Sequence, residues 1–270
     1  MEIKNKLFMV TGAGSGIGKE LALGLLDKGA KVAAVDLRKD KLYELAQSLG
    51  DKKDSVETYV LEISDRVAVE KLPEEIASKQ GHVDAIINNA GIIQPFVKVN
   101  DLDYDAINRV MNVNFFGTLY MTKAFLPFLL KRPEAHIVNV SSMGGFLPVP
   151  GQSVYGASKA AVKLFTEGLY AELADTNVRV SVVFPGATQT NISKNSGINL
   201  PEQPTNAKPQ QAIPMLSAKD AAKIIIQGIE ANKLQIFTGK DSKLMNILYR
   251  LSPTYATNLI AKKMKSLLPK

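Results

Sequence analysis

Three polar side chains in the second half of the chain have the types and the spacing that acid–base chemistry at an alcohol or a carbonyl needs. Tyr155 and Lys159 stand four residues apart at the start of a stretch with helical periodicity, so both would lie on one face, one turn apart. A phenol has a pKa of about 10 in water. Because a neighbouring ammonium favours the phenolate, we expect Lys159 to lower the pKa of Tyr155. Ser142 follows a strand-like segment and could hydrogen-bond the same substrate oxygen.

A Tyr and a Lys at this spacing are also common on the surface of ordinary helices, and a Ser after a strand is often only part of a turn. The two residues and the hydroxyl therefore do not identify an active site by themselves. The elements that would bring them together have to supply the context.

Those elements alternate between short apolar runs and helical patterns. Strands are expected at 7–10, 31–36, 56–63, 85–87, 136–140, 179–183 and 234–237, and helices at about 16–28, 39–49, 67–79, 104–130, 155–175 and 218–231. Such alternation predicts a parallel sheet with helices on both faces. Because crossover connections are right-handed, the sequence predicts a single doubly wound α/β fold.

Residues 1–237 are expected to form one dinucleotide-binding catalytic domain, and residues 238–270 a basic amphipathic helical extension of it. A long polar stretch at about 191–216 contains several prolines and no regular pattern, which is typical of a functional loop, here a substrate lid. The N-terminal sequence has neither a signal peptide nor a run long enough to cross a bilayer, so a cytoplasmic protein is expected.

Composition excludes several other classes of protein. The chain has 270 residues, no cysteine and two widely separated histidines, so neither disulfides nor a metal site is expected. The net charge is +7, and residues 233–270 account for all of it, with eight Lys or Arg and one Asp. A basic tail on an otherwise neutral chain does not predict a nucleic-acid-binding surface.

A glycine-rich segment, Thr11-Gly-Ala-Gly-Ser-Gly-Ile-Gly18, follows the first strand and opens the first helix. Glycines there allow a tight turn and the close approach of a pyrophosphate to the N–H groups of the helix. Asp36 ends the second strand, where a carboxylate can bind both hydroxyls of an adenosine ribose. Asp36 could instead simply cap the next helix. The ribose role of Asp36 favours NAD. Because Arg38 could meet a 2′-phosphate, NADP stays open.

These features together resemble the classical short-chain dehydrogenase/reductase family, over roughly residues 5–237. The matching pieces are the glycine segment, Asn88-Asn-Ala-Gly91, Asn114, Ser142, Tyr155-x-x-x-Lys159, and Pro185-Gly186 with Thr190. The resemblance implies a Rossmann-type fold, an NAD(P) cofactor, and hydride exchange between the nicotinamide and a secondary alcohol or ketone.

The resemblance also implies roles for individual residues. Tyr155 would be the general acid or base, Lys159 would bind the nicotinamide ribose, and Ser142, rather than its neighbour Ser141, would orient the substrate oxygen. Asn114 would hold a water that relays protons to Lys159, with Asn112 as the alternative. The cofactor would be bound by Gly12, Gly14, Ser15, Gly16, Ile17, Gly18, Asp36, Leu37, Arg38, Glu62, Ile63, Asn89, Ala90, Gly91, Tyr155, Lys159, Pro185, Gly186, Thr188 and Thr190. Glu62 and Thr188 depart from the family's usual residues.

The expected partners are less specific. The segment 144–151 is apolar and would form one wall of the substrate site, which suggests an alcohol or ketone with apolar bulk. A homodimer or a homotetramer is expected. The basic, amphipathic tail could also contact an anionic membrane surface, pack over the lid, or mediate assembly. Two alternatives to this oxidoreductase remain: a non-catalytic nucleotide sensor that acts through a partner, and an NADPH-dependent 3-oxoacyl reductase.

Overall fold

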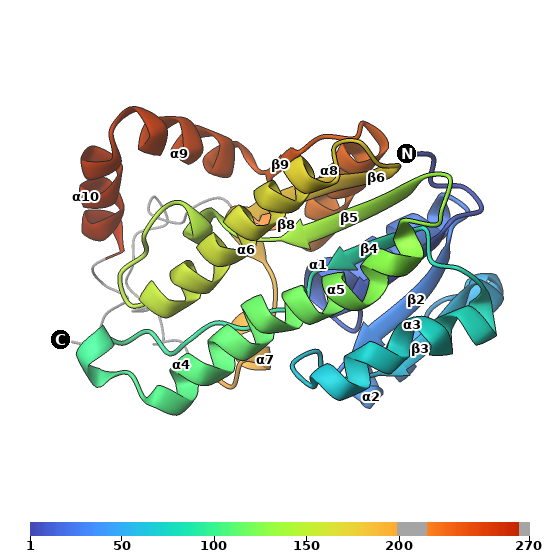
Figure 1. The fold of residues 1–270 in the computed structure, drawn as a ribbon. Helices are drawn as coiled ribbons and strands as arrows, with labels where there is room; N and C mark the ends of the chain where they lie inside the picture. Colours follow the sequence, from blue (N-terminus) through green and yellow to red (C-terminus); the bar gives the residue numbers. More distant parts are fainter. Residues whose placement is uncertain (199–214, 265–270) are drawn as a thin grey trace.

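The computed structural model describes residues 1–198 and 215–264, and it contains one seven-stranded parallel sheet in the order β3-β2-β1-β4-β5-β6-β9. The strands are β1 (Leu7–Thr11), β2 (Lys31–Asp36), β3 (Val56–Val60), β4 (Ala85–Asn88), β5 (Ala135–Val140), β6 (Val178–Pro185) and β9 (Gln235–Thr238). The strand order reverses between β1 and β4, and this is where α/β sheets of this kind place their ligands. The predicted doubly wound sheet is therefore confirmed (Figure 1).

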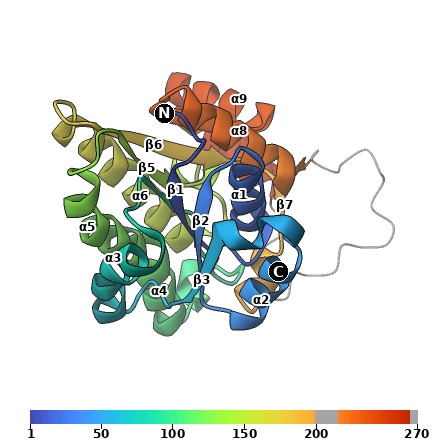
Figure 2. The ribbon, with the colours of Figure 1, turned by 90° about the vertical axis from the view of Figure 1, so that its right-hand side faces the viewer.

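Helices cover both faces of the sheet, because the inner strands are buried on both sides. Helices α1 (Gly16–Asp27), α2 (Lys39–Gln47) and α8 (Ala218–Glu230) pack on one face, and α3 (Arg66–Gln80), α5 (Thr118–Leu129) and α6 (Ser153–Glu172) on the other (Figure 2). A short pair, β7 (Thr188–Gln189) and β8 (Leu216–Ser217), lies apart from the main sheet. None of the helices in the described ranges is long and apolar enough to cross a membrane.

Two predicted elements differ from the observed ones. The third strand was expected at 56–63 but ends at Val60, because residues 61–63 turn away toward the helix α3 that follows. The helix expected at 104–130 is divided into α4 (Tyr104–Met111), a π-helical turn over Asn112–Gly117, and α5. Single π turns inside helices often occur at functional sites.

The C-terminal extension is helical, as expected, and packs against the rest of the chain. Helices α9 (Lys240–Leu251) and α10 (Pro253–Lys263) follow β9 (Figure 1). Their apolar side chains form a small cluster with Leu147 and Phe146, which lie in the loop before α6. At the start of α9, the Ser242 hydroxyl donates to the carbonyl of Phe184 at 2.8 Å. Most of the expected lid, with Lys208, and the last residues of the tail lie outside the described residues.

His136 is completely buried in β5, and its Nε2 lies 2.8 Å from the hydroxyl of Ser181. Burial, the nearby N-terminal ammonium and Arg179 lower the pKa of His136 to about 3, so the ring is neutral in the folded protein. It lies in the sheet and not among the residues that line the cavity described next.

Candidate active site

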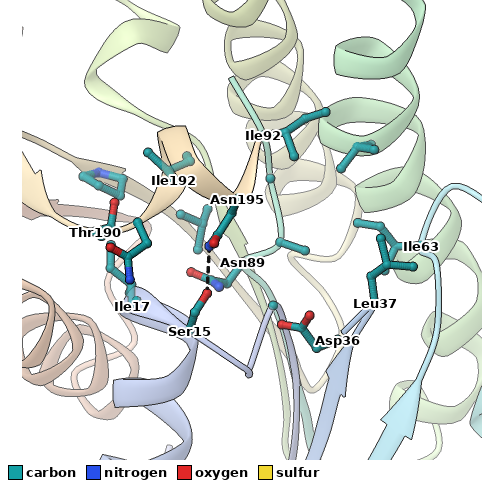
Figure 3. Close-up of a pocket in the computed structure, with 18 of the residues that line it drawn as sticks. Ser15, Ile17, Asp36, Leu37, Ile63, Asn89, Ile92, Thr190, Ile192 and Asn195 are labelled. Atoms are coloured by element: carbon teal, nitrogen blue, oxygen red, sulfur yellow. Dashed lines mark hydrogen bonds between the residues drawn. The ribbon is translucent and has the colours of Figure 1, made fainter. Parts of the chain in front are cut away.

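A cavity of about 340 Å³ lies at the carboxyl ends of the central strands (Figure 3). Each strand from β1 to β6 delivers residues to it where the strand ends, as expected for a sheet of this topology. The predicted residues in its lining are Gly12, Ser15, Gly16, Ile17, Asp36, Leu37, Arg38, Glu62, Ile63, Asn89, Ala90, Gly91, Ser142, Tyr155, Pro185, Gly186, Thr188 and Thr190. Gly14, Gly18, Asn114 and Lys159 do not belong to the lining.

The glycine turn that opens α1 has the shape of an anion cradle. Gly12 and Gly16 have φ angles of +67° and +53°, which side chains with a Cβ rarely adopt. A Cβ on Gly18 would overlap the carbonyl oxygen of Gly12, so the first turn of α1 packs directly on the end of β1. Ser15 makes no side-chain cap bond to α1, which leaves the N–H groups of this helix end available to a phosphate.

Asp36 lies behind this turn and fixes its position. Its Oδ2 accepts a hydrogen bond from the N–H of Gly14 at 2.9 Å, and its Oδ1 accepts one from the N–H of Arg38, also at 2.9 Å. The Arg38 guanidinium donates to the Ser15 hydroxyl at 3.2 Å and to Oδ1 of Asn195 at 3.0 Å. Both partners of Arg38 are neutral, and its Nε lies 3.9 Å from Asp36.

Residues near the start of the segment predicted as a substrate lid also line the cofactor cavity, where no contact was predicted for them individually. Asn195, at the end of the short helix α7 (Ile192–Asn195), donates to the Ser15 hydroxyl at 3.0 Å across the mouth of the cavity (Figure 3). Asn191 and Ile192 lie beside it in the lining. A polar residue in a long loop carries no local signal of a partner 180 residues away.

The loop after β4 is held by the strand next to it. The N–H groups of Asn89 and Ala90 donate to the Thr11 hydroxyl at 2.9 and 3.0 Å, and the Asn89 side chain donates to the carbonyl of Thr11. A Cβ on Gly91 would lie 3.0 Å from Nζ of Lys159 and 3.2 Å from Oδ1 of Asn114. The backbone of this loop at Gly91 therefore lies between the cavity and the side chains of Lys159 and Asn114.

Asn114 lies in the π turn and is fully buried, whereas its alternative Asn112 is exposed. Its amide accepts from the N–H of Ile92 at 2.8 Å and donates to the carbonyl of Ile92 at 2.9 Å and to Ser158 at 3.0 Å. The side chain thus ties the β4 loop to α6, directly beside Lys159. Both N–H groups of the Asn114 amide are thereby used, whereas its oxygen has one further acceptor position that a water could occupy.

The two neighbouring serines after β5 have different surroundings. The Ser141 hydroxyl donates to the carbonyl of Lys159 at 2.7 Å and so serves to attach α6 to the sheet. The Ser142 hydroxyl accepts from the N–H of Gly144 at 3.0 Å and lies beside the ring of Tyr155. This arrangement favours Ser142 as the hydroxyl that meets a substrate.

The pKa values of the Tyr–Lys pair differ from the sequence-based expectation. Burial within the protein walls raises the pKa of the Tyr155 phenol, and the neighbouring Ser142 hydroxyl partly opposes that shift. Burial lowers the pKa of Lys159 to about 8, and its ammonium donates to the carbonyl of Val140 at 2.9 Å. The expected lowering of the Tyr155 pKa by Lys159 is therefore wrong for the structure without cofactor, because the cost of desolvation dominates.

Other predicted residues occupy the edges of the cavity. Glu62 is exposed and accepts a hydrogen bond from the Ser64 hydroxyl at 2.8 Å, so its side chain is directed along its own loop. Ile63 is buried against Gly117 of the π turn. The Thr188 hydroxyl donates to the carbonyl of Gly186 at 3.1 Å.

The geometry fits a dinucleotide that extends from Asp36 to Tyr155. The glycine turn, the Asp36 carboxylate and the Tyr155 phenol all line this one cavity. Residues that the sequence did not predict also line this path, namely Val35, Leu61, Ile92, Val113, Val140, Ser141, Asn191, Ile192 and Asn195. Many of them are apolar, which suits the faces of an adenine and a nicotinamide ring.

The chain is similar to short chain dehydrogenases and to oxidoreductases over most of its length. The sequence profile of the short chain dehydrogenases matches residues 6–200. SadH of Mycobacterium tuberculosis, an oxidoreductase by name, is 36% identical over 265 residues, which cover 96% of this chain and 95% of that protein. The 3-oxoacyl-[acyl-carrier-protein] reductase FabG of Thermotoga maritima is 37% identical over 205 residues, covering 75% of this chain and 80% of that protein.

Solved structures of similar proteins contain both forms of the cofactor. A short chain dehydrogenase/reductase from Burkholderia phymatum, in complex with NAD, has a TM-score of 0.82 and 27% identity, covering 93% of this chain and 96% of its own. A short chain dehydrogenase from Burkholderia cenocepacia, in complex with NADP, has a TM-score of 0.79 and 28% identity, covering 96% and 99%.

Proposed function

The chain belongs to the short-chain dehydrogenase family, and from this we propose that it is a nicotinamide-dependent oxidoreductase that interconverts a secondary alcohol and a ketone with apolar bulk. The observation that supports this most is the single cavity wall shared by the glycine turn, Asp36, Ser142 and Tyr155. A cofactor held at the glycine turn could extend along this lining to the phenol.

In this proposal the side chains divide the chemistry among them. The bound cofactor supplies or accepts the hydride. Ser142 donates a hydrogen bond to the substrate oxygen, and Tyr155 gives that oxygen a proton in ketone reduction or takes one in alcohol oxidation. A phenol with a raised pKa is protonated at neutral pH and is therefore ready to act as the acid. Lys159, one layer of backbone away, would bind the cofactor ribose and favour the phenolate once a proton has left.

Replacing Tyr155 by Phe tests the proposal. The substitution keeps the ring and removes the proton, so turnover of hydrophobic ketones should collapse while cofactor binding persists. Unchanged turnover would remove Tyr155 from the chemistry. If the natural protein itself turns over no alcohol or ketone, the non-catalytic nucleotide sensor would be favoured instead.

We further propose that NAD is preferred over NADP. The carboxylate of Asp36 lies at the position proposed for the adenosine ribose, where it would repel a 2′-phosphate. The Arg38 guanidinium already donates to Ser15 and Asn195, and its Nε lies 3.9 Å from Asp36, so these contacts oppose a move of Arg38 toward a 2′-phosphate. Asp36→Ala should weaken NADH more than NADPH, and an equal loss of both would remove Asp36 from the ribose.

A 3-oxoacyl reductase is the second candidate, and the similarity to FabG of Thermotoga maritima favours it. Such an enzyme would need NADPH, and Asp36 argues against this cofactor. Turnover of an acyl-carrier-bound 3-oxoacyl chain with NADPH, faster than any free ketone with NADH, would establish this second function in place of the first.

Assembly into a homodimer or homotetramer is a further part of the proposal. Leu164 and Tyr170 on α6 are 70% and 49% exposed, and Phe116 of the π turn is 37% exposed. Apolar side chains gathered on neighbouring helices favour a subunit contact. Sedimentation velocity would test this, since Leu164→Lys should shift an oligomer toward the monomer.

A peripheral membrane contact is proposed for α9. Leu244, Ile247 and Leu251 recur on one exposed face of this helix, with Lys243 and Arg250 exposed beside them. Apolar residues flanked by positive charge suit an anionic lipid surface. Co-sedimentation with phosphatidylserine vesicles, absent with phosphatidylcholine alone and lost in Leu251→Glu, would support the contact; no binding to either would exclude it.

A further inference from the structure

The N-terminus of α6, the helix that carries Tyr155, is not capped by the side chain of its N-cap residue. Gln152 precedes α6 as the N-cap residue, and its side chain makes no capping bond. The side chain of Gln94, in the loop after β4, takes this role from a distance. Its Oε1 accepts hydrogen bonds from the N–H of Val154 at 2.8 Å and the N–H of Tyr155 at 2.9 Å. Two of the four N–H groups that every helix start leaves unpaired are thereby satisfied by one buried oxygen.

Gln94 is itself held rigidly. The Gln94 side chain is completely buried, and its Nε2 donates to the carbonyl of Gly151 at 3.0 Å. The backbone carbonyl of Gln94 accepts from Nε2 of Gln152 at 2.7 Å. The amide orientation is unambiguous, because the oxygen faces two N–H donors and the nitrogen faces a carbonyl. The side chain and the backbone of Gln94 together therefore join the loop after β4 to both sides of the α6 start.

The same loop lines the cofactor cavity. Gly91 and Ile92 belong to the cavity lining, and Asn114 holds Ile92 by both its N–H and its carbonyl. Gln94 follows two residues later. Hydrogen bonds at Ile92 and at Gln94, joined by the short stretch of loop backbone between these residues, thus connect the wall of the cofactor cavity to the backbone N–H of Tyr155.

We propose that Gln94 is a positioning residue, which fixes the Tyr155 end of α6 relative to the cofactor-lining loop. Its consequence for turnover rests on the function proposed above, whereas its effect on the position of Tyr155 does not. The first turn of a helix frays when its N–H groups lose their partners. Because a displacement of about 1 Å at a reacting group can cost on the order of 100-fold in rate, such fraying would separate the Tyr155 hydroxyl from Ser142.

The test compares Gln94→Met, which keeps the length of the side chain and removes its hydrogen bonds, with a control on the same helix. The control is Thr166→Val, an isosteric change that removes the hydroxyl accepting from Asn139 at 3.0 Å, far along α6 from Tyr155. Amide hydrogen exchange at Val154 and Tyr155 measures the cap directly. The Cζ resonance of 13C-labelled Tyr155, identified with Tyr155→Phe, measures the surroundings and the pKa of the phenol without any substrate.

In Gln94→Met, exchange at the two amides should accelerate about tenfold or more, since each loses a buried partner, and the Tyr155 resonance should move. With 1-phenylethanol and NAD as a turnover probe, kcat should fall by about ten- to a hundredfold, with a smaller change in the affinity for NADH. Thr166→Val should change neither the two amides nor the Tyr155 resonance. Unchanged exchange and an unmoved resonance in Gln94→Met would overturn the proposal.

Gln94→Glu provides a second variant in case the first does not fold. A carboxylate can still accept from both N–H groups, so exchange at Val154 and Tyr155 should remain slow. The added negative charge next to the backbone of Tyr155 should raise the pKa of its phenol and move the pH profile of turnover to higher pH. An unshifted Tyr155 titration, together with fast exchange at both amides, would contradict the proposal. Absence of turnover in the natural protein would count against the proposed function alone, because the two spectroscopic measurements decide the role of Gln94.

Discussion

Replacing Lys159 by Met should make the cofactor-free protein more stable while it abolishes turnover. Lys159 is 3% exposed, and burial lowers its pKa from 10.5 to about 8. A shift of this size corresponds to about 3 kcal/mol of destabilisation whenever the side chain is charged. Methionine fills nearly the same space without that cost. The variant leaves the carbonyl of Val140 without the Lys159 bond, which costs about 1–2 kcal/mol, so the net gain is about 1–2 kcal/mol.

The pH dependence of this gain has a definite sign. The folded protein releases the Lys159 proton near pH 8, and the unfolded chain releases it near 10.5. Between these values the unfolded state binds more protons, so the stability of the natural protein rises with pH in that window. The advantage of Lys159→Met is therefore complete below pH 8 and disappears above about 10.5.

Thermal unfolding followed by circular dichroism, at pH 7 and at pH 9.5 without cofactor, measures the effect. A gain of this size raises Tm by about 2–6 °C at pH 7 for a chain of this length, and by less at pH 9.5. Lys163→Met is the matched control, because Lys163 lies one turn further along α6, partly exposed and paired with Glu167 at 2.8 Å. It should change the free energy of unfolding by less than about 0.5 kcal/mol. A Tm of Lys159→Met below that of the natural protein would refute the reasoning.

Four substitutions and one change of pH test the glycine turn, the buried histidine and the ribose site. Gly18→Ala should abolish NADH binding and destabilise the protein, since its Cβ would overlap the carbonyl of Gly12; Gly168→Ala, where a Cβ meets nothing within 4 Å, should instead stabilise α6 by up to about 1 kcal/mol. Acidification from pH 7 to pH 5 should lower the free energy of unfolding by about 2 kcal/mol through His136, because the pKa of about 3 in the folded protein lies below that in the unfolded chain. Urea unfolding of His136→Gln should show a smaller loss of stability over the same pH range. Asp36→Ala should lower the ratio of NADPH to NADH dissociation constants, measured by fluorescence titration, and an unchanged ratio would count against the ribose role.

The sequence predicted the parts of the fold that depend on local pattern. Apolar runs such as β5 are buried on both sides, and Gly12 and Gly16 of the glycine turn have positive φ angles, which residues with a Cβ rarely adopt. Asp36 could be placed because it ends a strand next to that turn. These predictions need only the neighbours of each residue along the chain.

The features that the sequence missed depend on distant partners. Nothing in the helical pattern around Asn114 distinguishes a π turn from a regular helix, because the turn is stabilised by contacts with Ile92 and Ser158. The capping partner of Tyr155 is a glutamine 61 residues earlier. The direction of the Tyr155 pKa shift was misjudged for the same reason, since the extent of burial is set by the packing of several elements.

The most direct test of a nicotinamide-dependent function is titration of the purified protein with NADH and with NADPH, in which nicotinamide fluorescence reports binding. The account predicts saturable binding of NADH at one site per chain, weaker binding of NADPH, and loss of both in Gly18→Ala. Tight NADPH with weak NADH would contradict the assignment of Asp36 to the ribose. Binding of neither cofactor would contradict the proposed function itself.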